Sequence, residues 1–109
     1  MGRRDEQEPG LGGEVLEKPE QKTAKPRLFN VILHNDDYTT MEFVVLVLET
    51  VFQKASPDAF RIMMQVHLSG RGLCGAYPFD IAETKAETVH EMARDKGYPL
   101  RATVEEADV

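Results

Sequence analysis

A short polar segment at residues 35–39 (NDDYT) carries the densest group of hydrogen-bonding side chains in the chain. Apolar residues flank it on both sides, among them Leu33, Met41 and Val44. Asn, Asp and Thr are the residues that turns and helix caps use, so a polar turn explains the segment without any ligand. The same oxygens also suit a cation held at the rim of an apolar patch. The segment alone leaves both interpretations open.

A histidine follows on a second segment, which has helical spacing. Met63 and His67 lie four residues apart, so they share one face of a helix, with Val66 beside them. A histidine near a helix end usually faces solvent or bonds to the backbone. This plain interpretation stays open beside a binding role for His67.

Metal and nucleophile chemistry are not expected from the remaining reactive side chains. His34, His67 and His90 lack the spacing of metal ligands. Cys74, the single cysteine, lies in a short apolar run, and we expect it to be buried and inert. No paired base, oxyanion site or cofactor loop accompanies it. The sequence therefore predicts a protein that is not an enzyme, with no metal and no cofactor.

Length and charge limit the classes of partner. The 109 residues suffice for one compact domain. A formal net charge of −6 without clustered basic residues argues against nucleic acid and membrane surfaces as partners. One cysteine excludes an intramolecular disulfide and fits a cytoplasmic protein. Residues 1–26, rich in Gly, Pro and charge, predict a flexible tail, and residues 27–109 predict the core domain.

The periodicity of the core domain predicts an α+β fold of order β-α-α-β-α-β, a three-stranded antiparallel sheet packed against three helices. The expected strands lie at 27–33, 73–77 and 100–104. The first expected helix runs from Thr39 to about Lys54 and the third from Pro78 to Gly97. The second has Ser56 as cap and Pro57 as first residue, and Gly70 and Gly72 mark its end.

Two local patterns support the helix assignments. Thr39 precedes Glu42 by three residues, which is the spacing of a capping box, so we expect Thr39 to cap the first helix. Apolar residues at helical spacing, starting at Met41 in the first helix and at Ile81 in the third, predict the faces turned to the core.

Four segments, NDDYTTMEFV, RIMMQVH, AETK and YPL, then make the part from about Lys25 to Val104 resemble the ClpS family of bacterial N-end rule adaptors. The resemblance implies that Asn35, Asp37 and His67 bind the α-amino group of a substrate. A terminal ammonium has three donors and a positive charge, so convergent acceptors with an ionised carboxylate suit it.

The resemblance also implies a pocket for the first side chain of the substrate, an N-degron with Leu, Phe, Tyr or Trp at its first position. The matching pocket residues are Leu33, Thr39, Met41, Val44, Met63, Val66 and Leu100. In the family the methionine that matches Met41 screens out β-branched side chains. Two methionines, Met41 and Met63, would let one pocket fit aliphatic and aromatic shapes.

The partners implied by the resemblance are N-degron substrate proteins and the N-terminal domain of the AAA+ unfoldase ClpA, which feeds the ClpP protease. The positions that match the docking surface are Tyr38, Asp80, Glu83, Thr84 and Lys85. We expect a monomer whose tail assists delivery.

Three positions depart from the family pattern. Thr40 replaces a common proline, His34 stands where an apolar residue near the pocket is usual, and Asp80 shortens a docking glutamate by one methylene. These changes bear on the range of first residues accepted and on docking strength. The rival interpretation is a protein-contact domain of similar shape, like the C-terminal domain of the ribosomal stalk protein, without amine recognition.

Overall fold

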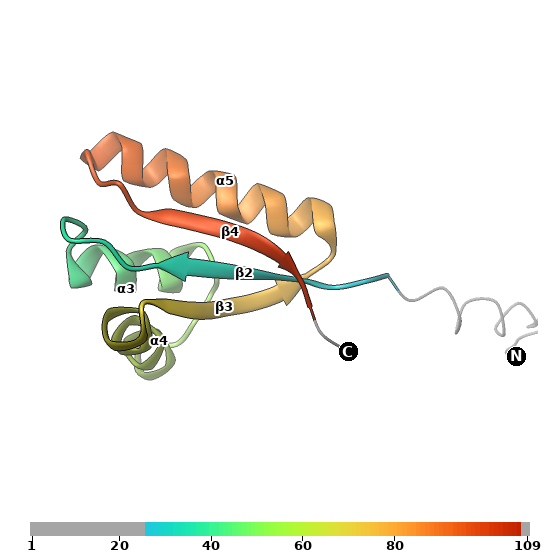
Figure 1. Cartoon of the computed structure of the whole chain (residues 1–109), viewed down its shortest axis with the longest axis horizontal. Helices are drawn as coiled ribbons and strands as arrows, with labels where there is room; N and C mark the ends of the chain where they lie inside the picture. Colours follow the sequence, from blue (N-terminus) through green and yellow to red (C-terminus); the bar gives the residue numbers. More distant parts are fainter. Residues whose placement is uncertain (1–25, 108–109) are drawn as a thin grey trace, which may run out of the picture.

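The structure is a computed structural model that describes residues 26–107. The predicted tail at 1–26 therefore lies outside the described residues, apart from Pro26. The predicted α+β order is confirmed, with three strands and three helices (Figure 1). The elements are β2 (Phe29–His34), α3 (Met41–Thr50), α4 (Ser56–Ser69), β3 (Arg71–Tyr77), α5 (Phe79–Lys96) and β4 (Arg101–Glu106).

The sheet is antiparallel, with β2 in the middle of the order β3-β2-β4. His34, at the end of β2, pairs with Arg71 on one side and Arg101 on the other. Phe29, at the start of β2, pairs with Tyr77, the last residue of β3. The loop that follows β2 and the start of α5 therefore leave opposite ends of the sheet, as Figure 1 shows.

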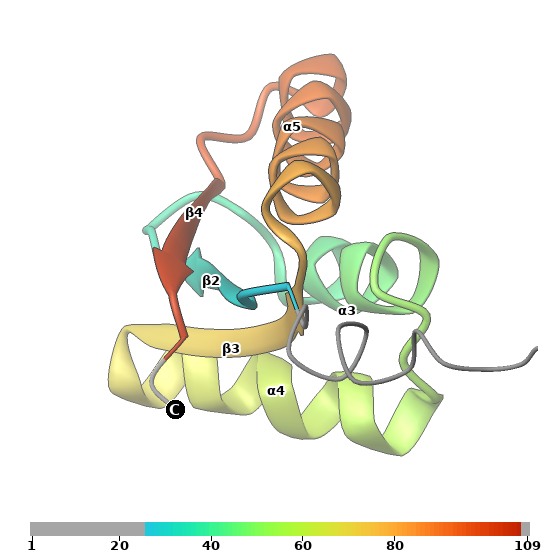
Figure 2. The ribbon, with the colours of Figure 1, turned by 90° about the vertical axis from the view of Figure 1, so that its right-hand side faces the viewer.

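The helices and the sheet enclose one core. Figure 2 shows α4 running along β3 in the lower part of the view and α5 in the upper part, with α3 between α4 and α5. The strand β4 packs against α5. Fully buried side chains from several elements meet in the core, including Val31 and Leu33 of β2, Val47 of α3 and Val89 of α5. No helix within residues 26–107 is long and apolar enough to cross a membrane.

The first helix is capped by a different threonine from the one predicted. Thr40 precedes α3, and its hydroxyl accepts a hydrogen bond from the Phe43 N–H at 3.1 Å. Thr39 instead donates its own hydroxyl to Asp36, so the predicted capping box with Glu42 is wrong. In a capping box Glu42 would accept a hydrogen bond from the Thr39 N–H, but the Asp36 carboxylate already accepts from both the N–H and the hydroxyl of Thr39, at 2.7 Å each.

Other predicted boundaries move by a few residues. The first helix ends at Thr50 and not at about Lys54. The second is capped by Ala55, without a side-chain hydrogen bond, so Ser56 is its first residue and not its cap. Gly70 and Gly97 end α4 and α5 in the left-handed region, at φ 92° and 78°, where glycine carries no steric penalty. Gly72, also expected to mark the end of the second helix, lies in β3 because the strand begins directly after the Gly70 cap.

Two residues expected to face the core lie on the surface. Met41 is 42% exposed and Ile81 is 45% exposed, each in the first turn of its helix. A first-turn residue lies at the edge of the packed layers, where helical spacing alone does not decide burial. The exposure of Met41 matters because it lies beside a cavity.

Candidate functional site

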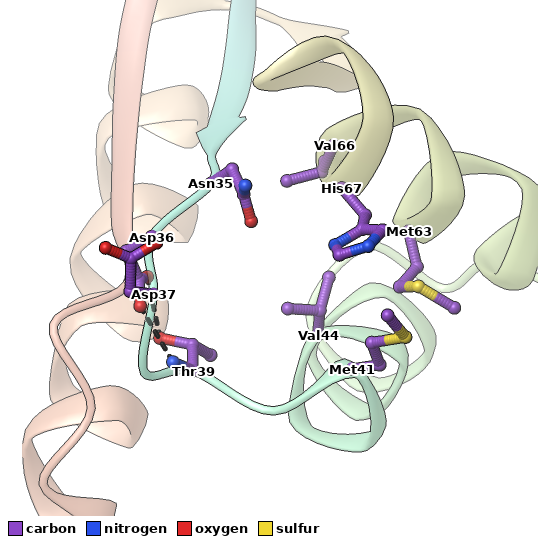
Figure 3. Close-up of a pocket in the computed structure, with 9 residues that line it drawn as sticks. All are labelled: Asn35, Asp36, Asp37, Thr39, Met41, Val44, Met63, Val66 and His67. Carbon is purple, nitrogen blue, oxygen red and sulfur yellow. Dashed lines mark hydrogen bonds between the residues drawn. The ribbon is translucent and has the colours of Figure 1, made fainter.

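A cavity of about 250 Å³ lies where the loop after β2 meets α3 and α4. Its wall combines a polar group from the loop with an apolar group from the two helices, as Figure 3 shows. The lining residues are Asn35, Asp36, Asp37, Thr39, Met41, Val44, Met63, Val66 and His67. All three residues expected to bind an amine therefore line a single cavity.

The polar wall offers acceptors that solvent reaches. Asn35, Asp37 and His67 are all exposed. In Figure 3 the Asn35 side chain and the His67 ring point toward the same opening from the loop and from α4. The Asn35 N–H donates to the Gly70 carbonyl at 2.9 Å, which ties the start of the loop to the end of α4. That bond holds the loop acceptors close to the helix that carries His67.

The two carboxylates of the loop have different surroundings. Asp36 accepts three hydrogen bonds, from the Tyr38 N–H at 2.8 Å and from the N–H and hydroxyl of Thr39 at 2.7 Å each. Partial burial alone raises the pKa of Asp36, but the bonds from Thr39 and Tyr38 outweigh it and lower the pKa below its usual value. Asp36 therefore holds the shape of the loop.

Asp37, by contrast, receives no hydrogen bond from any residue of the described part of the chain. Asp37 is exposed and belongs to the wall of the cavity. An exposed carboxylate without an internal donor keeps its full capacity to accept bonds from a cation. The neighbouring Asp36 has already committed both oxygens to the loop, so the two acids are not equivalent.

The apolar wall is largely closed to solvent. Val44, Met63 and Val66 are 6%, 4% and 3% exposed, whereas Met41 stands at the rim. Leu33 and Leu100, which the resemblance assigns to the same pocket, do not line the cavity. They lie in the core behind it, 0% and 4% exposed, so they support the wall and do not form its surface.

His34 does not line the cavity either. Its Nε2 lies 2.7 Å from the Thr103 hydroxyl oxygen of β4. Burial, followed by the charges of Arg101 and Arg71, lowers the pKa of His34 below its usual value. Side chains alternate across a strand, so Leu33 points into the core and His34 points to the other face of the sheet. His34 therefore does not contact the pocket and cannot narrow it directly.

The residues expected to dock on an unfoldase fall into two places. Asp80, Glu83 and Thr84 line a second hollow of about 440 Å³ together with Ala86, Glu87 and Val104. Tyr38, which is 75% exposed, belongs to the loop at the opposite end of the sheet. The two groups therefore do not form one continuous patch.

Lys85 has an internal role. Its ammonium donates to the Val51 carbonyl at the end of α3 at 2.7 Å and lies 3.4 Å from Gln53 Oε1. It also lies 5.2 Å from the centre of the Tyr77 ring and 5.9 Å from that of Phe52. Cations near a helix C-terminus and over aromatic rings are stabilised. Lys85 thus joins α5 to the loop between α3 and α4.

Among the residues that the structure describes, neither a cysteine nor a metal site belongs to the cavity wall. Burial raises the pKa of the Cys74 thiol to about 12, so the thiolate is scarce at neutral pH. Within residues 26–107, no group of three or more His, Cys, Asp or Glu side chains could hold a metal ion. The prediction that Cys74 is buried is confirmed.

Sequence reasoning did not place Asp36 in the cavity wall, although it named Asp36 as part of the polar turn. The signal was present in the spacing, because an Asp followed by Thr three residues later favours a turn in which the carboxylate accepts backbone N–H groups. Two adjacent acids could divide such roles in either order. Only the hydrogen bonds decide that Asp36 is the internal one.

Taken together, these elements define a small α+β binding domain with an apolar cavity edged by exposed acceptors. Residues 24–103 match the family model described as ATP-dependent Clp protease adaptor protein ClpS. The chain belongs to the ClpS family, whose members are adaptors of the Clp protease.

Relatives across most of the chain agree with this membership. The ATP-dependent Clp protease adapter protein ClpS of Desulfatibacillum aliphaticivorans is 58% identical over 93 residues, which cover 85% of this chain and 89% of the relative. That of Caulobacter vibrioides is 49% identical over 96 residues, 88% of each. A solved structure of Agrobacterium tumefaciens ClpS2, bound to L-phenylalaninamide, is similar with a TM-score of 0.73 and 40% identity. It covers 76% of this chain and 100% of that one.

Proposed function

We propose that this protein binds the free amino end of proteins whose first residue is Leu, Phe, Tyr or Trp. The observation that supports the proposal is that Asn35, Asp37 and His67 line one cavity together with apolar residues of α3 and α4. Asp37 supplies the charge that an ammonium needs, while Asn35 and a neutral nitrogen of His67 supply further acceptors. The phenylalaninamide bound by the Agrobacterium relative presents the same two groups, a free amine and a large apolar side chain.

The two walls select different features of the ligand. An internal peptide bond has one neutral donor and no charge, so it would leave these acceptors poorly paired. The apolar wall takes the first side chain, and burying a Leu or Phe there is worth roughly 1.5–3 kcal/mol before the costs of binding. The domain is proposed to act by binding alone, without catalysis.

Fluorescence anisotropy with labelled peptides tests the proposal. A peptide that begins with Phe and its N-acetylated copy share every side chain, and only the first should bind. Binding should also weaken as pH rises past about 8, because a terminal amine then loses its proton. Equal affinity for the two peptides, or affinity unchanged well above that pH, would reject amine recognition.

We further propose delivery of the bound protein to the N-terminal domain of the ClpA unfoldase in the cytoplasm, with the chain acting as a monomer. Asp80, Glu83 and Thr84 are exposed around the second hollow and suit a protein contact there. Lys85 would join that contact through its remaining donors, and Tyr38 would touch a separate part of the partner. Residues 1–26 would help to transfer the substrate.

A pull-down with the isolated ClpA domain tests this second step. Glu83→Arg should abolish capture, whereas Glu49→Arg, on α3, reverses a charge elsewhere and should retain it. If both variants are captured as well as the unchanged chain, docking at this hollow is wrong. Capture that persists while N-terminal peptides fail to bind would favour the rival, a domain used only for protein contacts.

A further inference from the structure

Gly72 of β3 lies directly behind the apolar wall of the cavity. It pairs with Leu33 of β2, and it is buried. A Cβ at this position would lie 2.6 Å from Cγ2 of Val66, and 3.4 and 3.5 Å from the carbonyl oxygen and Cγ2 of Ile62. Carbon atoms in contact lie about 3.5–4.0 Å apart, so the Val66 methyl would have to recede by about 1 Å.

The side chain of Val66 has few ways to recede. Val is β-branched, and one rotamer dominates in a helix. Val66 is 3% exposed, and Ile62, one turn earlier on α4, is buried against the same strand. Figure 3 shows Val66 pointing from α4 toward the open space of the cavity. The free volume next to Val66 is therefore the cavity itself.

We propose that Gly72 sets the depth of the pocket: by leaving room for the Val66 methyl, it admits aromatic first residues as well as leucine. This inference rests on the proposed function and adds a positioning residue that does not touch the ligand. The backbone of Gly72 is not in the left-handed region, so glycine is not required there for its φ angle. Glycine matters at this position because it has no side chain that would press on Val66.

Gly72→Ala tests the inference through a ratio of affinities. Dissociation constants are measured for peptides that differ only in their first residue, which is Leu, Phe or Trp. We expect the variant to lose affinity for the Phe and Trp peptides and to keep its affinity for the Leu peptide. One methylene of misfit in an apolar pocket changes discrimination by roughly 10- to 200-fold, and we expect the lower end. A general loss of folded protein would weaken all three peptides alike and leave the ratio unchanged.

Gly75→Ala is the matched control. Gly75 lies in the same strand, but the three atoms nearest to its added Cβ would all belong to Tyr77, the closest being the hydroxyl oxygen at 2.5 Å, and Tyr77 does not line the cavity. We expect that variant to keep the original ratio of Phe to Leu affinity. A shift of equal size in the control would show that any added methyl in β3 alters the pocket, and the inference would fail.

The double variant Val66→Ala/Gly72→Ala covers the case in which Gly72→Ala alone does not fold. Removing the Val66 methyls gives the new Cβ its room, so the double variant should prefer the same first residues as Val66→Ala. A narrower range in the double variant would mean that Gly72 acts through another residue. If the unchanged chain binds none of the peptides, the proposed function fails; if it binds them and Gly72→Ala leaves the ratio intact, only this inference fails.

Discussion

Asp37→Asn keeps the size of the side chain and removes its charge, and we expect it to weaken binding of a Phe-first peptide by roughly 10- to 150-fold. The figure follows from the geometry of the loop, where Asp37 is exposed at the cavity and no described residue donates to it. A hydrogen bond to a charged group is worth about 1.5–3 kcal/mol, and 1.4 kcal/mol is tenfold in the dissociation constant. The stability of the fold should hardly change.

Asp36→Asn is the matched comparison, because it makes the same chemical change one residue earlier. The Asp36 carboxylate accepts bonds from the backbone of Tyr38 and from Thr39, an arrangement similar to a helix cap. Asn keeps one acceptor oxygen and loses the charge, so we expect its replacement to lower the free energy of unfolding by about 1 kcal/mol in urea titrations, the difference between a charged and a neutral hydrogen bond. Peptide binding should fall less than in Asp37→Asn.

Acid titration separates the two residues further. The pKa of Asp36 is lower in the folded state than the ordinary value of 3.8. A lowered pKa means that the contribution of Asp36 to stability is fully present above the unfolded pKa and is lost as pH falls through the folded pKa. As the pH falls below about 4, Asp36→Asn should therefore lose less stability than the unchanged chain does. Anisotropy and urea unfolding on the two variants decide the question: a larger loss of binding in Asp36→Asn would refute the division of roles.

Three further predictions concern stability and reactivity. Thr40→Ala should cost about 1 kcal/mol in urea unfolding, because the Phe43 N–H loses its cap acceptor; an unchanged midpoint would contradict the cap assignment. Lys85→Met keeps most of the stem but leaves the Val51 carbonyl without its donor, so we expect a loss of about 1–2 kcal/mol by the same assay. Cys74 should resist iodoacetamide at pH 8 in the native state and react in urea, as mass spectrometry would report; rapid native alkylation would show that the thiol is not buried.

The order of elements was predictable because each helix and strand carries its own periodicity and its own stop signals. Gly70 and Gly97 end two helices where the sequence predicted, since a left-handed residue there favours glycine. The cap of α3 was not predictable in the same way. Two consecutive threonines, Thr39 and Thr40, both precede the helix, and the choice depends on a carboxylate three residues upstream.

The sequence predicted some of the residues that line the cavity but not all of them. The spacing of Met63, Val66 and His67 predicts that they share one face of a helix, and all three line the same cavity. Whether Leu33 and Leu100 reach that space depends on how deeply each side chain is buried, and the type of an apolar residue does not predict this. The place of Tyr38 depends on which end of the sheet its loop leaves, and that follows from strand pairing, not from local sequence.

Amine and side-chain recognition should also be coupled. Asn35, Asp37 and His67 are exposed, so water competes for them until a ligand covers the cavity mouth. A large first side chain excludes that water, and an ion pair gains strength as its surroundings become less polar. Acetylation should therefore cost a Phe-first peptide more than an Ala-first peptide, with a coupling in the range of 0.5–3 kcal/mol that neighbouring groups show, ~1 kcal/mol here. Titration calorimetry on the four peptides measures it; strictly additive effects would mean that the acceptors are already desolvated in the empty site.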